Sequence, residues 1–269
     1  MLRVIILTSG PYGTASRCLP ELVASDEVEV ISVVMAKPAA SSNAFNNYKR
    51  KFKKAIKIGI IGTLNGIRMR PWFAGEPTEH IETVCNKLGI PLYRTGAVNS
   101  DRTVELFRAA NADLGLSLGN RYISRRIFSI PRLGMINVHC ERLPEYRNAE
   151  GVIWNIYNME RITGFTVHEI DDKIDTGRIL YREEFPIEFH ASIKKTVTNT
   201  IRQSSIKVPY AVRYVCENYD ELSERAKPQS KGKSYSTPTF SDFLVMIRNN
   251  RKLFEGAPLP TTEHSVCDS

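Results

Sequence analysis

No run of about 18 apolar residues occurs in the sequence, so no transmembrane helix and no membrane partner are expected. The apolar stretch near the N-terminus spans only Val4–Leu7 and is followed by turn residues, which predicts a first strand rather than a signal peptide. No two cysteines have Cys-x-x-Cys spacing, and the five are scattered: Cys18, Cys85, Cys140, Cys216 and Cys267. This pattern predicts neither a disulfide framework nor a metal site, and it fits a reducing, cytoplasmic location.

Two common catalytic signatures are also missing. The first expected strand-to-helix turn reads Ser9-Gly10-Pro11-Tyr12-Gly13, which is not the Gly-x-Gly-x-x-Gly fingerprint of a dinucleotide site. No serine or cysteine stands in a recognisable nucleophile elbow, so we expect no covalent acyl-enzyme. In an open parallel sheet such a first turn still directs backbone N–H groups at ligands. We therefore assign Ser9, Gly10 and Tyr12 to substrate binding.

The chain has 269 residues, 42% of them hydrophobic, and a formal net charge of +8. This length predicts one core domain and an appendage, which we place at residues 1–190 and 191–269. Much of the charge lies in YKRKFKKAIK, Tyr48–Lys57, inside a basic excursion over residues 37–77. The stretch is either a solvated helix face or a patch for a phosphorylated substrate, nucleic acid or an anionic membrane surface.

The order of the expected elements predicts an α/β fold. Strands are expected at residues 3–9, 28–36, 114–118, 135–140, 162–171 and 177–187. Helices are expected at residues 16–26, 192–225 and 240–254, with Pro209 as a kink or restart in the second of these. A strand, a helix and a second strand at the start are typical of a parallel sheet. We predict a Rossmann-like, mostly parallel sheet flanked by helices, with a small C-terminal helical and coil appendage.

Three polar residue types with complementary chemistry lie near the ends of expected strands. Asn137 and His139 are two residues apart in one strand, so both point to the same face. Asp175 follows in a loop between two later strands, with Asp171 and Asp172 beside it. An amide and a protonated imidazole can donate to a developing oxyanion, while a carboxylate holds the imidazolium or accepts a proton. The set predicts an acyl-transfer site in which the acceptor attacks directly.

Taken alone, His139 and Asn137 would also suit a hydrogen-bonded core histidine and a capping asparagine. The surrounding motifs are more specific: Asn137-Val138-His139, Leu143-Pro144, Thr163-Gly164-Phe165-Thr166-Val167-His168 and Asp175-Thr176-Gly177. In this order they resemble the catalytic core of the formyltransferases that use 10-formyltetrahydrofolate, closely from Ser117 to Ile187 and more loosely before. The resemblance implies that Asn137, His139 and Asp175 are catalytic and that 10-formyltetrahydrofolate is the co-substrate.

The resemblance also implies where the two substrates lie. The pterin is expected between two loops whose main-chain groups read its edge, and the residues assigned to it are Asn120, Arg121, Tyr122, Ile123, Asp171 and Asp172. The segment LPEYR adds Tyr146 and Arg147 to the substrate site. Many relatives carry glycine where this chain has Asn148, so the acceptor cannot be carried over from them. His168 recurs in the family, and its place in a strand favours a structural role.

Several acceptors compete. A methionyl-tRNA formyltransferase would carry a C-terminal β-barrel, which the tail does not predict, so tRNA is not expected as a partner. A glycinamide ribonucleotide formyltransferase would be shorter, with a Gly/Asn/Ser phosphate loop at the first turn. Sugar N-formyltransferases are more similar in LPEYR, DDKIDTGRIL and KGKSYSTPTFSDF, which favours a nucleotide-linked amino sugar, a small-molecule amine. Another small amine, a formyltetrahydrofolate hydrolase, a non-catalytic folate-binding relative and a homodimer stay open.

Overall fold

The computed structural model describes residues 1–37, 59, 61–120, 122–148 and 151–256. The basic stretch Tyr48–Lys57 and the residue Arg121 lie outside the described residues, so the expectations for them stay predictions. None of the helices in these described ranges is long and apolar enough to cross a membrane.

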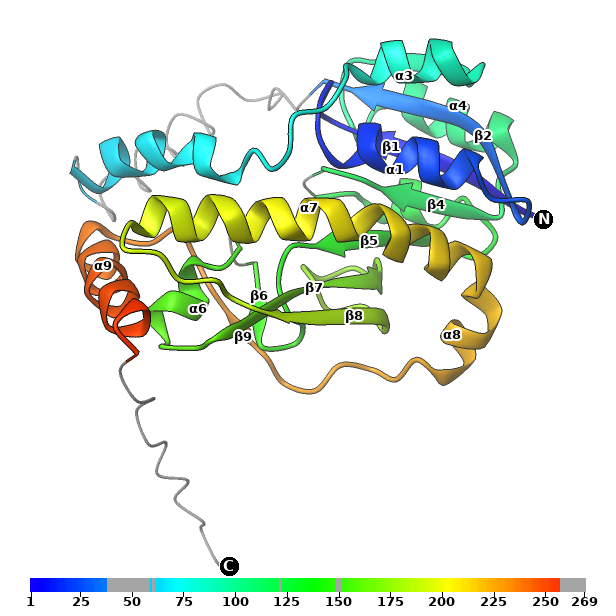
Figure 1. The fold of residues 1–269 in the computed structure, drawn as a ribbon. Coiled ribbons are helices and arrows are strands. Elements are labelled where there is room, and N and C mark those ends of the chain that lie inside the picture. The colour runs from blue at the N-terminus through cyan, green and yellow to red at the C-terminus, as the bar shows by residue number, and fades with distance from the viewer. Residues whose placement is uncertain (38–58, 60, 121, 149–150, 257–269) are drawn as a thin grey trace, which may run out of the picture.

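Seven strands form one sheet in the order β3-β2-β1-β4-β5-β7-β8 (Figure 1). The strands are β1 (Leu2–Thr8), β2 (Val28–Ala36), β3 (Leu92–Thr95), β4 (Leu114–Ser117), β5 (Met135–His139), β7 (Ile162–Glu169) and β8 (Ile179–Pro186). The strands β1 to β5 pair in parallel, whereas β7 is antiparallel to both β5 and β8. The predicted mostly parallel sheet is confirmed. The strand order reverses between β1 and β4, and open sheets bind ligands at the carboxyl ends beside such a reversal.

Alternate residues of β1 supply two apolar cores, one on each face of the sheet. Val4 and Ile6 belong to a core that includes buried residues of α1, α3 and α7, whereas Ile5 and Leu7 belong to a core under α4 and α5. The helices that cover the sheet are α1 (Thr14–Val23), α3 (Ile81–Leu88), α4 (Asp101–Ala110), α5 (Arg125–Phe128), α7 (Ile193–Glu217) and α8 (Tyr219–Arg225). Because β1 is buried on both faces, its sequence is a continuous apolar run.

The helix α7 crosses most of the molecule (Figure 1). It runs through Pro209 as one helix of 25 residues, so the proline does not restart it. Val208, Val212 and Val215 are buried in the same core as β1 and α1. The extension expected from residue 191 onwards therefore begins with a helix that covers the sheet.

The C-terminal tail returns across the domain and ends in α9 (Phe240–Phe254), the helix expected there. On the way, β9 (Lys233–Ser234) pairs in parallel with β6 (Tyr146–Arg147). A capping box starts α9, because the side chains of Thr239 and Asp242 each accept from the other's backbone N–H.

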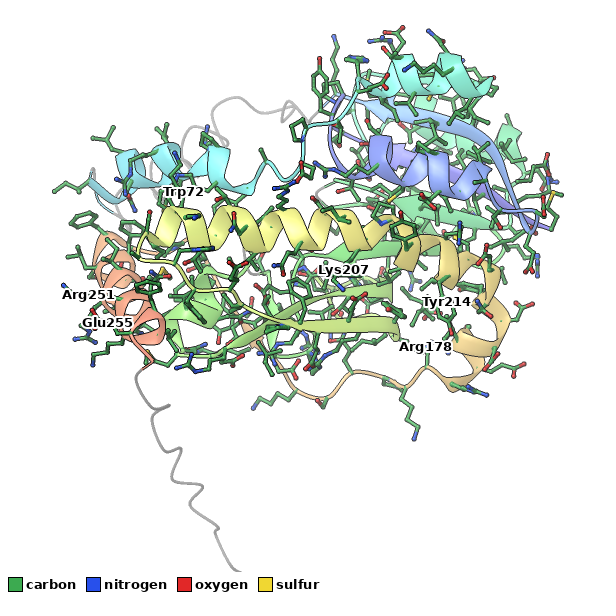
Figure 2. All side chains as sticks on the ribbon, in the orientation of Figure 1. Trp72, Arg178, Lys207, Tyr214, Arg251 and Glu255 are labelled. Atoms are coloured by element: carbon green, nitrogen blue, oxygen red, sulfur yellow. The ribbon has the colours of Figure 1, made fainter. Side chains whose placement is uncertain are left out.

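A third apolar core joins the tail to an insertion that precedes α3. The insertion is helical at residues 61–69 and continues as the 3-10 helix η1 (Arg70–Phe73). Trp72, labelled beside the first half of α7 in Figure 2, is buried in this core with Phe243 of α9 and Ile153 of the short helix α6 (Ile153–Tyr157). The insertion and the tail, which are far apart in the sequence, therefore pack against each other.

Candidate active site

Three residues expected to act together lie around one cavity. Asn137 and His139 lie on β5, and Asp175 comes from the loop between β7 and β8. His168 of β7 pairs directly with Asn137 across the antiparallel ladder, which puts both side chains on one face. All four residues line a cavity of about 1180 Å³. The structure thus brings an amide, two imidazoles and a carboxylate to one site.

The imidazole of His139 has a neighbour at each ring nitrogen, and only 8% of the residue is exposed. Its Nε2 lies 2.7 Å from the backbone oxygen of Tyr146. A carbonyl can only accept, so Nε2 donates to it. Nδ1 lies 3.6 Å from Oδ2 of Asp175. With Nε2 committed to the backbone, Nδ1 is the nitrogen that faces the carboxylate and remains for chemistry.

His168 is the partner of the Asn137 amide. Its Nδ1 donates to the backbone oxygen of Glu169 at 2.7 Å, so its Nε2 accepts from Nδ2 of Asn137, 3.3 Å away. Burial lowers the pKa of His168, although the carboxylate of Asp175 opposes that shift. The fold therefore favours a neutral His168 that orients the Asn137 amide. The sequence favoured a structural role for His168, and only the register of β5 and β7 places it on the face of the site.

The loop that carries Asp175 has an unusual backbone. Asp175 has a φ of 54°, in the left-handed region that few residues other than glycine, asparagine and aspartate enter. Gly177 is required by space, since a Cβ there would lie 1.8 Å from the backbone oxygen of Glu169. The carboxylate is 3.8 Å from Nε2 of His168 through Oδ1 and accepts from the backbone N–H of Asn148 at 2.9 Å through Oδ2.

The backbone conformation of Asn148 accounts for an asparagine where many relatives carry glycine. Asn148 also has a φ of 54°, a conformation that glycine allows and asparagine tolerates. Its side chain donates to the backbone oxygen of Tyr235 at 2.9 Å. The left-handed backbone and the N–H bond to Asp175 are therefore both compatible with asparagine at this position. Residue type does not reveal a main-chain donor, so the sequence carried no signal for this contact.

The tail fastens the same two loops through one side chain. Nε2 of Gln229 donates to the backbone oxygen of Gly177 at 2.6 Å. Its Oε1 accepts from the guanidinium of Arg147, with the shorter contact at 2.9 Å. One loop carries Asp175 and the other carries Asn148, whose N–H binds the Asp175 carboxylate. Gln229 therefore links the two loops that position this carboxylate. Nothing in the sequence indicated this role.

The residues assigned to the folate site are partly assembled at the cavity. Tyr122, Ile123, Asn120 and Asp171 line it. The amide of Asn120 donates to the backbone oxygen of Leu7 at 2.5 Å, so this side chain ties β1 to the loop after β4. Asp172 points elsewhere: it pairs with Arg125 at 2.8 Å on an exposed surface.

The residues assigned to the acceptor are not among the described residues that line the cavity. Ser9 donates to Asn120 at 2.7 Å, and Gly10 bonds to the Thr8 hydroxyl. Tyr12 is 61% exposed, and its ring packs edge-on against a neighbouring histidine. The ring of Tyr146 is buried and its hydroxyl donates to Glu160, while Arg147 bonds to Gln229. Their assignment to the acceptor stays a prediction.

The wall beyond His139 comes instead from segments that the sequence did not connect. They are the insertion before α3, the first turn of α1, the middle of α7 and the tail, and the residues include Arg17, Arg70, Phe73, Ser204, Ser205 and Ser236. In the sequence, only Ser204 and Ser205, which interrupt the apolar pattern of α7, could have indicated that this helix lines a cavity.

No group of three histidine, cysteine, aspartate or glutamate residues able to hold a metal ion occurs in the described part of the chain.

The sequence model of the formyl transferase family matches residues 2–212. Among known proteins, the chain is similar to the methionyl-tRNA formyltransferase of Thermodesulfovibrio yellowstonii, 32% identical over 108 residues, and to that of Flavobacterium johnsoniae, 41% identical over 81 residues. These matches cover 40% and 30% of this chain. They span only 35% and 26% of the length of those two relatives.

Solved structures share the fold over a larger part of the chain. A glycinamide ribonucleotide transformylase from Symbiobacterium toebii has a TM-score of 0.56 at 14% identity and covers 86% of this chain and 92% of its own. A sugar N-formyltransferase from a Shewanella species has a TM-score of 0.55 at 16% identity, over 93% of this chain and 88% of its own. HypX from Aquifex aeolicus, solved in complex with tetrahydrofolic acid, has a TM-score of 0.53 at 13% identity, over 93% of this chain and 34% of its own.

Proposed function

The chain belongs to the formyl transferase family, and from this premise we propose that it transfers the formyl group of 10-formyltetrahydrofolate to the amine of a nucleotide-linked amino sugar. One observation carries the proposal: Asn137, His139 and Asp175 line one cavity, with Nδ1 of His139 3.6 Å from the Asp175 carboxylate. A folate-binding protein without turnover would need no such set of donors and acceptors at one point.

The residues have separate tasks in the proposed reaction. The acceptor nitrogen attacks the formyl carbon, a C–N bond forms, and the formyl oxygen becomes negative. The amide of Asn137 and a protonated Nδ1 of His139 donate to that oxygen. Asp175 accepts the proton that the attacking nitrogen loses. The oxyanion then collapses to the carbonyl, the bond from the formyl carbon to N10 of the folate breaks, and N10 takes the proton that Asp175 accepted, which leaves a formamide and tetrahydrofolate.

The cavity is large enough to hold more than one small ligand. Pockets for single small ligands usually measure about 300–1,000 Å³, and this one is larger at about 1180 Å³. Tyr122, Ile123 and Asp171 supply an apolar and polar wall suited to a pterin with polar edges. The space beyond His139 is left for the acceptor, which supports a bulky molecule rather than a simple amine.

The test is a turnover assay with 10-formyltetrahydrofolate and a panel of nucleotide-linked 3-amino and 4-amino sugars. Tetrahydrofolate should appear only when a suitable sugar is present, and the sugar should gain a formyl group by mass. Formate released at the same rate without any acceptor would identify a hydrolase instead. Absence of transfer to every sugar in the panel would overturn the proposed acceptor class.

A second candidate acceptor is methionyl-tRNA, because the relatives described above are methionyl-tRNA formyltransferases. A tRNA reader loses affinity steeply with salt, since each neutralised phosphate releases counterions. Formylation of charged tRNA, with binding that weakens strongly between low and moderate salt, would favour this candidate over the sugar.

His168 should act on the reaction only through Asn137. His168→Phe keeps an aromatic ring, somewhat larger than the imidazole, but removes the acceptor of the Asn137 amide, and loss of one hydrogen bond of this kind corresponds to about 1 kcal/mol. We expect kcat to fall about fivefold to tenfold. In an Asn137→Ala background the same substitution should change kcat little, which a double-mutant cycle measures. Equal effects in both backgrounds would mean that His168 supports the fold alone.

Gln229 should hold Asp175 in place from the tail. Gln229→Ala removes its bonds to Gly177 and Arg147, and we expect kcat to fall about tenfold, roughly 1.4 kcal/mol, while the KM values change less. Lys231→Ala is the matched control, because Lys231 is an exposed residue of the same segment. A Gln229→Ala enzyme as fast as the control would show that the loops keep their shape without the tail.

A further inference from the structure

The two ends of the cavity differ in charge. Around the loop between β7 and β8, Lys173 lies near two carboxylates, Asp171 and Asp175. On the wall beyond His139, the charged side chains among the described lining residues are Arg17 and Arg70, and both are cationic. Glu76 adjoins this wall but is paired with Arg202 and is not part of the lining. This end of the cavity therefore suits a ligand with negative charge.

Arg17 is held in place by the insertion that precedes α3. Its Nη2 donates to the backbone oxygens of Ala74 and Glu76, the first at 3.3 Å. Its Nε is buried and has no hydrogen-bond partner in the described part of the chain. Burial lowers the pKa of Arg17 from its ordinary value, as expected for a cation with no carboxylate against it. No described carboxylate neutralises the Arg17 guanidinium, so a bound anion would pair with its charge.

Arg70 lines the cavity from η1, a 3-10 helix that is anchored by the buried Trp72. It opens η1, whose Trp72 is 6% exposed and packs against Phe243 with ring centroids 6.2 Å apart. The guanidinium of Arg68 lies over both rings, 5.6 Å and 5.4 Å from their centroids. Arg70 itself is exposed and makes no ion pair with any described residue. The helix η1 thus places at the cavity a guanidinium that has no ion-pair partner among the described residues.

We propose that Arg17 and Arg70 bind the phosphate groups of the acceptor and so determine acceptor specificity. The free guanidinium of Arg70 can bind phosphate oxygens in bidentate fashion, whereas Arg17, whose Nη2 is bound to backbone oxygens, contributes chiefly its charge. Together the two cations match the charge of a diphosphate. The hydroxyls of Thr14 and Ser204 line the same wall and can donate to the remaining oxygens. This inference rests on the proposed sugar formyltransferase, because it names the part of the nucleotide-linked substrate that the insertion reads.

The test compares Arg70→Met with Arg248→Met, which removes another exposed arginine, from α9. With the nucleotide-linked amino sugar, Arg70→Met should raise the acceptor KM at least tenfold, with kcat and the KM for 10-formyltetrahydrofolate within twofold of wild type. The same sugar without its nucleotide should show no difference between the variants. Arg70→Lys should recover only part of the loss, because an ammonium lacks the bidentate fork.

Binding without turnover separates this inference from the proposed reaction. A nucleoside diphosphate alone is titrated against wild type and Arg70→Met by calorimetry. Tighter binding by wild type supports the phosphate site even if no amino sugar is formylated. An unchanged acceptor KM in Arg70→Met, while sugar formylation proceeds, would overturn the phosphate site and leave the reaction standing. A rise in the folate KM instead would show that these arginines hold the glutamate carboxylates of the folate, which also overturns it.

Discussion

Asn137→Ala is expected to lower kcat by about 10²–10³-fold, roughly 3–4 kcal/mol, because it removes a preorganised donor to the developing oxyanion. The amide is held for this task by His168, whose Nε2 lies 3.3 Å from its nitrogen. His139→Ala should cause a loss of similar size. That variant also leaves the buried backbone oxygen of Tyr146 without its donor, so its unfolding temperature has to be recorded beside its rate.

The matched control is Asn86→Ala on the exposed face of α3, which should turn over like wild type. Rates are measured as tetrahydrofolate formed per enzyme, with both substrates saturating. An Asn137→Ala enzyme that keeps more than a third of the wild-type kcat would remove the amide from the proposed oxyanion site.

Asp175→Asn is expected to lower kcat by about 10²–10⁴-fold, the range for loss of a general acid or base. The substitution should leave the backbone of the loop unchanged, because Asp175 has a φ of 54° and asparagine accepts that left-handed conformation. The amide can still accept from the backbone N–H of Asn148 through its oxygen. What is lost is the negative charge opposite Nδ1 of His139 and the capacity to take a proton.

Folate binding should survive in this variant and is measured by equilibrium titration with tetrahydrofolate. Asp220→Asn, an exposed carboxylate on α8, controls for the change of one charge. Undiminished kcat in Asp175→Asn would mean that the aspartate only shapes its loop. A loss of folate affinity as large as the loss in kcat would move its role from proton transfer to binding.

The part of the fold that was predictable from sequence rests on local patterns. Strands such as β2 are β-branched apolar runs, and α9 begins at a capping box, so their positions followed from neighbouring residues. The continuation of α7 through Pro209 was not predictable in the same way. Its valines are buried against the sheet, and that packing outweighs the backbone hydrogen bond that a proline removes.

The sequence alone determined that Asn137 and His139 share a face, because residues two apart in a strand always do. It also set the local motifs that resemble the family, including the glycine that lets the Asp175 loop close. Only the tertiary structure decided that His168 lies opposite Asn137, since that depends on the register of two strands. It alone brought Gln229, Arg70 and Ser204 to the site from segments with no common local pattern. Such long-range contacts follow from how helices and loops pack on the sheet, and packing depends on the whole chain at once.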